Sequence, residues 1–289
     1  MFPKKIHISP ALLLTTPAYL WLTLTIFLPL TAMLYFSFLS EAPLGNRVPY
    51  LTLENYISFF QKDFYQALTW RSLRLGLEVT FLCFLIGFPC ALVLTRHISN
   101  RWREALFILV ILPFWSNALV RIFSWTMVLR GKGFIELILN WMNPDYGSFS
   151  MMFTYPAIIL GLVHSYLPYM ILTCYVSLQA IDETLIEAAR SLGAGRMIIL
   201  WKLIIPLSLP GISAGTVLIF VPVVGSFMEP RILGGREGTF IGTIIEDQFV
   251  KVFNWPLGAA LSFIMLALVM VILLLAYTIS KKWTLYLED

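Results

Sequence analysis

Six stretches of this chain are long and apolar enough to cross a lipid bilayer, and each holds at most two charged residues. We place them at about 11–38, 73–95, 104–129, 154–178, 209–232 and 257–279. About 20 apolar residues in a helix span the hydrocarbon core. An open sheet edge cannot face lipid, and no segment alternates as a barrel strand does. The pattern predicts an all-α polytopic membrane protein with about six transmembrane helices in a single domain, residues 1–289.

Composition argues against a soluble globular protein. The chain is 59% apolar and 12% charged, whereas charged residues make up about 25% of an average soluble domain. Its net charge of +4 arises from basic residues at the ends of the apolar segments. That charge therefore requires no nucleic-acid partner.

Basic residues favour one orientation across the membrane, because Lys and Arg are enriched in short cytoplasmic loops. The pair Lys4–Lys5 precedes the first apolar segment, which is too long for a signal peptide and is expected to be retained. With six spans, the pair Lys281–Lys282, the basic loop 96–103 and the long loop 179–208 all lie on the same side as Lys4–Lys5. We therefore expect both termini in the cytoplasm.

The two loops expected on the outer side each contain an amphipathic stretch. Aromatic and apolar residues recur at near-helical spacing in 53–60 and again in 134–141. This spacing predicts short helices at the membrane interface, whose outer faces are available to a soluble partner.

The loop 179–208 begins with a polar helix. Asp182 is suited to cap its first turn, and Glu187 lies where the helix dipole favours a negative charge. Glu187 and Arg190 are three residues apart and are expected to pair on one face. Gly193 can adopt the left-handed backbone that ends a helix.

A second short helix is expected at about 195–204, before the chain returns to the membrane. Pro206 and Pro210 follow it closely. Because proline lacks the amide hydrogen that a helix interior needs, we expect the chain to break there.

This loop resembles the EAA loop of permeases from bacterial ATP-binding-cassette (ABC) importers. The family pattern is Glu-Ala-Ala, a Gly six residues after the Glu, and a Pro thirteen residues after that Gly. The chain matches it at Glu187, Ala188, Ala189, Gly193 and Pro206. Ser191 departs from it, since relatives often carry Asp there. The alternative is an ordinary amphipathic loop.

The resemblance implies a type I ABC importer permease fold and a bacterial inner-membrane location. It implies that the loop couples the permease to a separate ATPase through Glu187, Ala188, Ala189, Arg190, Gly193 and Pro206. The expected partners are a second homologous permease, two copies of an ATP-binding subunit, an extracytoplasmic solute-binding protein and membrane lipid.

The chain has no G-x-x-x-x-G-K-[ST] phosphate loop. We therefore expect it to hold no cofactor and to hydrolyse no ATP, with ATP and Mg²⁺ bound by the partner ATPase. No catalytic constellation and no zinc-ligand set is evident. His164 has no ligand companions, so we interpret it as a hydrogen-bonded packing residue.

Further motifs resemble the first permease subunit of spermidine/putrescine importers. They lie at 112–121, 166–170, 210–215, 233–235 and 241–249. The resemblance implies a polyamine cargo. Relatives in this branch also carry opines, amino-acid derivatives and phosphonates, and those alternatives stay open.

A polycation needs carboxylates and aromatic faces along its path. The candidates are Trp115, Asn117, Arg121, Tyr166, Glu229, Arg231, Glu246 and Asp247. Aromatic residues near span ends are also common interface anchors. Arg231 opposes a polycation, so it is expected either to pair with Glu229 or to favour a zwitterionic or anionic cargo.

Another class of protein, an ion-coupled secondary transporter, would show inverted repeats and a carboxylate near the midplane. No repeat is visible, and the segments are nearly free of acids. Arg74 and Glu78 are four residues apart in the second segment, which favours an internal ion pair.

Overall fold

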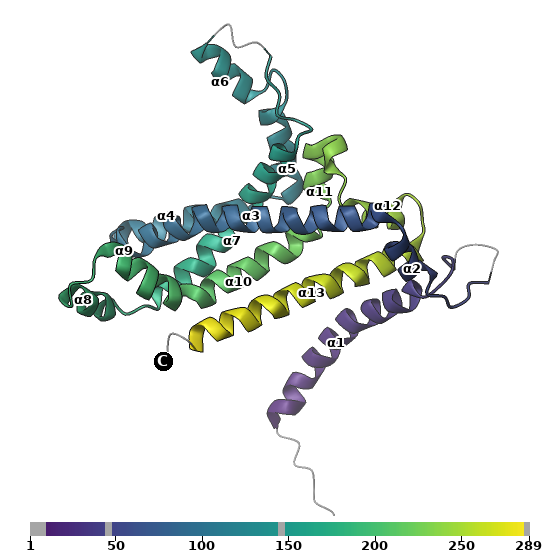
Figure 1. Ribbon diagram of the computed structural model, residues 1–289, viewed down its shortest axis with the longest axis horizontal. Helices are drawn as coiled ribbons and strands as arrows, with labels where there is room; N and C mark the ends of the chain where they lie inside the picture. The colour runs from purple at the N-terminus through teal and green to yellow at the C-terminus, as the bar shows by residue number, and fades with distance from the viewer. Residues whose placement is uncertain (1–9, 44–47, 144–147, 286–289) are drawn as a thin grey trace, which may run out of the picture.

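The computed structural model describes residues 10–43, 48–143 and 148–285, which form a set of helices (Figure 1). Within these residues there is no strand, and an isolated antiparallel bridge joins Leu39 to Leu51. In chain order the elements are α1 (Pro10–Ser37), α2 (Glu54–Gln61), α3 (Asp63–Arg96), α4 (Asn100–Ile111), η1 (Leu112–Trp115), α5 (Ala118–Leu129), α6 (Phe134–Met142), α7 (Tyr155–Gln179), α8 (Glu183–Ser191), α9 (Arg196–Ile199), η3 (Leu200–Ile204), α10 (Ile205–Val224), α11 (Met228–Gly234), η4 (Gly235–Gly238), α12 (Ile241–Val250) and α13 (Trp255–Leu285). The elements η1 and η4 are 3-10 helices, and η3 is a π-helix. The prediction of an all-α protein is confirmed.

Five helices in the described part of the chain are long and apolar enough to cross a membrane. They are Leu14–Ser37, Asp63–Arg96, Tyr155–Gln179, Arg196–Val224 and Trp255–Thr278. A sixth span results if the bent pair Arg101–Trp115 and Ala118–Met142 is counted as one. The pair Lys4–Lys5 lies outside the described residues.

The predicted segment 104–129 is not one continuous helix. The chain turns by 94° between Trp115 and Ala118. Pro113 lies in the 3-10 turn η1, and the backbone of Ser116 and Asn117 is extended. The Asn117 side chain then accepts a hydrogen bond from the Leu119 amide at 2.8 Å and so caps α5. The bend therefore follows from a proline turn joined directly to a new N-cap.

The predicted segment 209–232 also differs from the structure. The helix starts earlier, at Arg196, and ends at Val224, while Glu229 lies on the separate helix α11. Pro206 and Pro210 do not break the chain as expected. Pro206 lies in the first turn of α10, directly after the π-helical turn η3. The looser π turn continues the helix past the missing proline amide.

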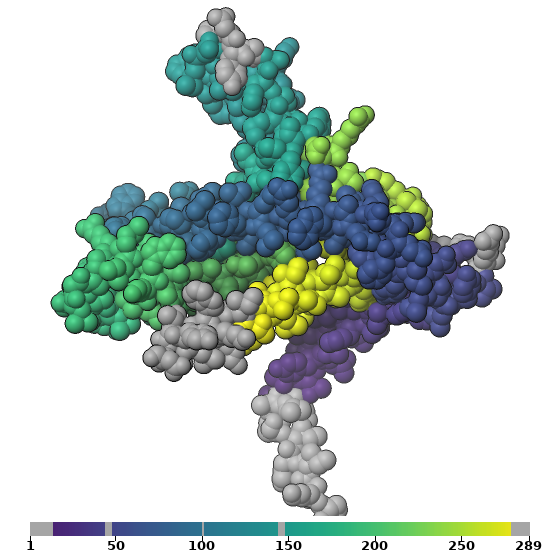
Figure 2. Space-filling model, viewed as in Figure 1, coloured from purple at the N-terminus to yellow at the C-terminus, as the bar shows by residue number. Residues whose placement is uncertain are grey.

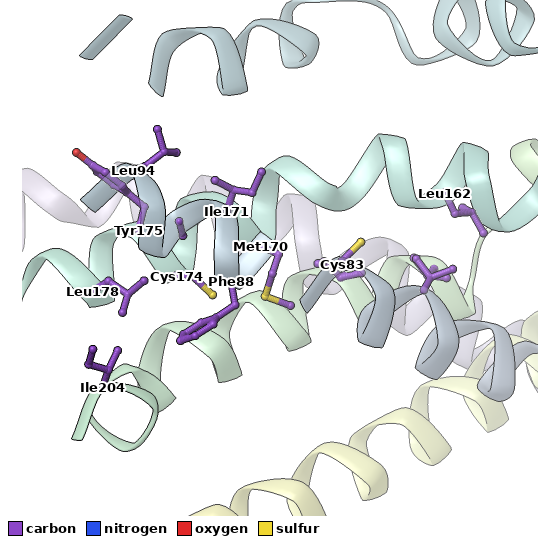
Figure 3. Packing of buried hydrophobic residues seen from close by; sticks show 14 of the residues in the cluster. Cys83, Phe88, Leu94, Leu162, Met170, Ile171, Cys174, Tyr175, Leu178 and Ile204 are labelled. Carbon is purple, nitrogen blue, oxygen red and sulfur yellow. The ribbon is translucent and has the colours of Figure 1, made fainter. Parts of the chain in front are cut away.

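Helices α3, α7 and α10 form the core of the bundle. Buried residues from α3 and α7, together with Ile204 of η3, pack in one cluster (Figure 3). Close approach depends on small residues. A Cβ on Gly211 of α10 would lie 2.4 Å from the Thr173 carbonyl oxygen of α7 and 2.4 Å from Ser177 Cβ. The two helices are therefore in near-backbone contact, as small residues permit in membranes.

A short polar chain joins α3 to α7. Arg74 Nε donates to Glu78 Oε1 at 2.7 Å, so the predicted internal ion pair is confirmed. The Tyr155 hydroxyl of α7 donates to Glu78 Oε2 at 2.6 Å. Glu78 thus accepts from both helices, as intramembrane charges usually require.

The remaining helices surround this core or leave it. Helix α1 lies along α13. Helix α5 packs against α7 and α11, and α6 projects away from the bundle at its far end, so that α5 and α6 form a bent arm (Figures 1 and 2). The predicted short helices of the outer loops are present as α2 and α6. Buried Glu136 of α6 accepts from the Lys132 amide at 2.7 Å and the Phe149 amide at 3.1 Å, which fixes the loop around the arm.

The contact at Gly211 gives a test of the core. We expect Gly211→Val to lower the free energy of unfolding by about 1–3 kcal/mol, because the added carbons meet a backbone carbonyl that cannot move away. Thermal unfolding of the purified chain in detergent measures the change. Ala214→Val, on an exposed position of the same helix, is the matched control. Equal stability of the two variants would contradict the close packing of α7 and α10.

Candidate functional site

The loop between α7 and α10 has the predicted helix start and helix end. Asp182 Oδ1 accepts from the Thr184 amide at 3.0 Å, and this backbone hydrogen bond lowers the pKa of Asp182. At the other end Gly193 has φ of +82°, the left-handed region. The amides of Gly193 and Ala194 donate to the carbonyls of Arg190 and Ala189 at 2.9 and 3.0 Å. Both local predictions are confirmed, and α8 is a well-capped helix.

Helix α8 is anchored on one face and open on the other. Ile186 is buried in the core cluster, and Ala189 is half-buried. Glu187 and Ala188 are exposed. The small side chain at Ala188 lets another surface approach the helix closely beside the carboxylate of Glu187.

The predicted pairing of Glu187 with Arg190 is wrong. Among the described residues neither side chain forms an ion pair. Arg190 instead lines a pocket that Arg96 of α3 also lines. Glu187 is therefore an exposed carboxylate that no cation of the described chain neutralises.

A second polar group forms where α5, α7 and α11 meet. Glu229 of α11 is 9% exposed. Burial raises the pKa of Glu229, and the nearby Arg121 guanidinium opposes that rise. Tyr166 of α7 lies within electrostatic range of both charges. Arg121 Nη1 donates to the Pro113 carbonyl at 3.2 Å, while its Nε is buried without a hydrogen-bond partner.

Aromatic rings line α7 beside this group. The Tyr166 and Tyr169 ring centroids are 6.1 Å apart, and Phe114 of η1 meets Tyr169 edge-on at 4.5 Å. Trp115 is 89% exposed and points away from close packing. Asn117 uses its side-chain oxygen to cap α5. The structure therefore brings Arg121, Tyr166 and Glu229 together but leaves Trp115 outside this packing.

His164 has the packing role expected of it. The Trp125 indole N–H of α5 donates to His164 Nδ1 of α7 at 3.2 Å. The two rings meet edge-on with centroids 5.4 Å apart. This bond holds the bent arm against α7, next to Arg121.

Arg231 does not pair with Glu229. Its Nη2 lies 2.5 Å from Glu246 Oε2 and 2.8 Å from Asp247 Oδ1, both on α12. Lys251 also reaches Asp247, at 2.6 Å. Partial burial acts to raise the pKa of Asp247, but the hydrogen bonds from Lys251 and Arg231 outweigh it and lower the pKa. Arg231, Glu246 and Asp247 thus form a connected ion-pair cluster between α11 and α12.

The sequence did not single out Phe114 as a contributor to this region. Phe114 extends the aromatic wall together with Tyr169, an aromatic candidate from the sequence motif at 166–170. Within the residues that the structure describes, no group of three or more His, Cys, Asp or Glu side chains could hold a metal ion. The region therefore combines a buried carboxylate and a guanidinium group with aromatic surface.

Comparison with known proteins agrees with this geometry. The family model described as "Binding-protein-dependent transport system inner membrane component" matches residues 84–284. The chain is 37% identical over 257 residues to the spermidine/putrescine transport system permease protein PotB of Escherichia coli (strain K12), covering 89% of this chain and 92% of that protein. It is 36% identical over 266 residues to PotB of Haemophilus influenzae, covering 91% of each.

A solved structure shares the fold. A chain from the crystal structure of a bacterial alginate ABC transporter, in complex with a periplasmic protein that holds an alginate pentasaccharide, superposes with a TM-score of 0.74. The match covers 94% of this chain and 93% of that chain at 18% identity. This similarity concerns the fold alone.

The burial of Glu229 predicts a dependence of stability on pH. A carboxyl group whose pKa is raised in the folded state destabilises the fold once the pH exceeds its unfolded pKa of about 4.3. We expect Glu229→Gln to raise the thermal stability of the purified chain at pH 7. The gain should shrink as the pH falls towards 4.3, where the wild-type carboxyl group is also neutral. A gain that is equal at pH 4 and pH 7 would contradict a charge effect.

Proposed function

The chain belongs to the family of binding-protein-dependent transport system inner membrane components, and on that premise we propose that the importer it serves carries a polyamine, spermidine or putrescine. The protein is a multi-pass inner-membrane permease subunit of an ABC importer, and it is not itself an enzyme. Both termini lie in the cytoplasm in this proposal, on the side of the α8–α9 loop.

The cargo proposal rests on which of the charged residues near α11 are already paired. An unpaired Arg231 would repel a polycation, but Arg231 forms ion pairs with Glu246 and Asp247. Glu229 is a buried carboxylate within electrostatic range of Tyr166, whose ring neighbours that of Tyr169. A protonated amine gains a charge-assisted contact at the carboxylate and cation–π contact at the rings.

A second cargo class is supported by Arg121. Its buried Nε has no hydrogen-bond partner, and its charge acts on Glu229. A zwitterionic solute, such as an opine or another amino-acid derivative, could place its amine at Glu229 and its carboxylate at Arg121. A polyamine has no group for Arg121, so the two classes differ in how they depend on this residue.

The exposed face of α8 is the proposed coupling surface. Glu187 and Ala188 would seat in a partner ATP-binding subunit, with Ala189, Arg190, Gly193 and Pro206 shaping and supporting the loop. Two such subunits would bind ATP and Mg²⁺. Their closure would move the loop, and α7 and α10 would move with it because the two helices are packed in near-backbone contact at Gly211. ATP and the loaded binding protein would thereby shift the permease between inward-open and outward-open states.

The α5–α6 arm is the proposed contact with a second, homologous permease. Its α5 end packs against α7 and α11, whereas its α6 end projects from the bundle (Figure 2), and the arm exposes Phe123, Met127, Leu137 and Trp141. These side chains give the arm an apolar face that the described bundle leaves uncovered, and a second permease in the same membrane could pack against it. A solute-binding protein would deliver the cargo from outside.

The coupling proposal is tested at Glu187. We expect Glu187→Arg to reduce ATP-driven uptake at least 10-fold while the protein still inserts, because the variant reverses the charge at the ATPase contact. Uptake by membrane vesicles that contain the complete importer measures this. Glu104→Arg, an exposed glutamate at the start of α4, is the control and should transport normally. Normal uptake by the Glu187 variant would exclude this residue from coupling.

The cargo proposal is tested at Glu229 and Arg121 together. Loss of a hydrogen bond to a charged group costs about 1.5–3 kcal/mol, so Glu229→Gln should weaken spermidine-stimulated ATPase activity of the complete importer about 10- to 100-fold. Arg121→Gln should leave that stimulation intact if the cargo is a polyamine. Stimulation by an amino-acid derivative that Arg121→Gln abolishes would support the zwitterionic class instead. Unchanged activity of Glu229→Gln would remove this residue from the ligand path.

A further inference from the structure

A basic pocket lies beside α8, on the side of the helix where Ile186 is buried. It has a volume of about 850 Å³ and is lined by the end of α3 and by α8, α9 and η3. Its charged lining consists of Arg96, Arg190, Arg196 and Glu183. Three guanidinium groups and one carboxylate give the pocket a net charge of +2. His97, which also lines the pocket, is counted as neutral in this sum.

These positive charges are not neutralised by the described chain. Arg190 and Arg196 are exposed and form no ion pair among the described residues. Arg96 donates only to backbone carbonyls, those of Leu178 at 3.2 Å and Ile181 at 3.0 Å. Its Nε is buried and has no partner. Three like charges in one concavity raise its potential, which attracts an anion.

The pocket and the exposed Ala188 of the coupling surface lie on different faces of α8. Glu187 lies between them, three residues from Arg190 and four from Glu183. Glu183, Ile186 and Arg190 are spaced three and four residues apart and so lie on one face, and Ile186 is buried in the core cluster. Ala188 lies on the other, exposed face. A partner that binds at Ala188 therefore does not cover the pocket lining, which faces the bundle.

The apolar part of the lining indicates what kind of anion fits. Leu92, Leu200 and Ile204 belong to helices that continue into the membrane-spanning bundle. Trp102 of α4 and Trp201 of η3 are each 65% exposed at this end of the molecule, and exposed tryptophans mark the level of lipid headgroups. Basic pockets between helix ends at this level bind anionic headgroups.

We propose that the basic pocket binds the phosphate group of an anionic phospholipid, with Arg190 and Arg196 holding the phosphate and the apolar wall contacting the acyl chains. Free inorganic phosphate shares the charge but has nothing to place against Leu92 and Leu200. The lipid ties the end of α3 to α8 and α9, and so joins the bundle to the loop. This inference needs the chain to be in a membrane, but it does not depend on the cargo.

Native mass spectrometry of the full-length chain in a neutral detergent tests the proposal. The probes are a phosphatidylglycerol, a phosphatidylcholine of equal chain length and inorganic phosphate. We expect the wild-type chain to retain phosphatidylglycerol at least 10-fold more tightly than either other probe. Equal retention of the two lipids would overturn the proposal. Tight binding of phosphate alone would assign the pocket to a soluble anion and overturn the lipid.

Matched variants separate the pocket from general surface charge. At about 5-fold in affinity for each basic residue near the headgroup, Arg190→Gln with Arg196→Gln should weaken phosphatidylglycerol binding about 25-fold. Arg101→Gln with Lys202→Gln removes the same charge outside the pocket lining at the same end and should have little effect. Equal weakening by both pairs would overturn the pocket as the site.

Two further measurements test whether the variants are misfolded and whether a protein side chain occupies the pocket instead of the lipid. Glu183→Gln removes the single carboxylate of the pocket, so it should tighten phosphatidylglycerol binding about 5-fold. A misfolded protein would not gain affinity. Displacement of the lipid on addition of the purified ATP-binding subunit would show that the pocket receives an acidic protein side chain instead, which would overturn the proposal.

Discussion

Backbone amide and carbonyl groups find no hydrogen-bond partner in hydrocarbon, so every interruption of a membrane helix has to be satisfied by the protein itself. This chain is interrupted at 112–117, where Asn117 caps α5, and again at 225–227, before α11 begins. The short helices that begin after these interruptions, α5 and α11, contain Arg121 and Glu229. The polar group of Arg121, Tyr166 and Glu229 therefore lies where the second half of a bent helix pair meets the short helix that follows a full span. Broken helices of this kind recur at binding sites of membrane transporters.

The charged residues of the permease fall into two classes. Arg74 with Glu78, and Arg231 with Glu246 and Asp247, satisfy each other and join neighbouring helices. Glu229, Glu187 and the arginines beside α8 have no such neutralising partner in the described chain. Burying or concentrating unpaired charge is unfavourable, so residues of the second class are where a solute, a subunit or a lipid would add most to stability.

Much of the fold could be predicted from the sequence, because span length and apolarity are local properties. The caps at Asp182 and Gly193 were equally predictable, since each depends on a single residue type. The bend after Trp115 was not, because hydropathy runs on across Pro113 and Asn117 without a gap. Ion pairs between elements were also beyond local spacing. Arg231 lies two residues from Glu229 yet pairs with Glu246 on another helix, and Arg190 turns from Glu187 towards the pocket beside Arg96.

The π-helical turn η3 determines more than how Pro206 is accommodated. A π turn holds about one residue more than an α turn, and each residue of an α-helix advances the direction of its side chains by about 100°. The segment before Leu200–Ile204, which includes α8 and α9, is therefore rotated about the helix axis by roughly 100°. The comparison is with an unbroken α-helix that continues into α10. Deleting one residue of this turn would turn Glu187 to a different side of the bundle and leave the spanning helix intact. The number of residues in this turn, rather than any one side chain, thus determines which way the coupling surface faces.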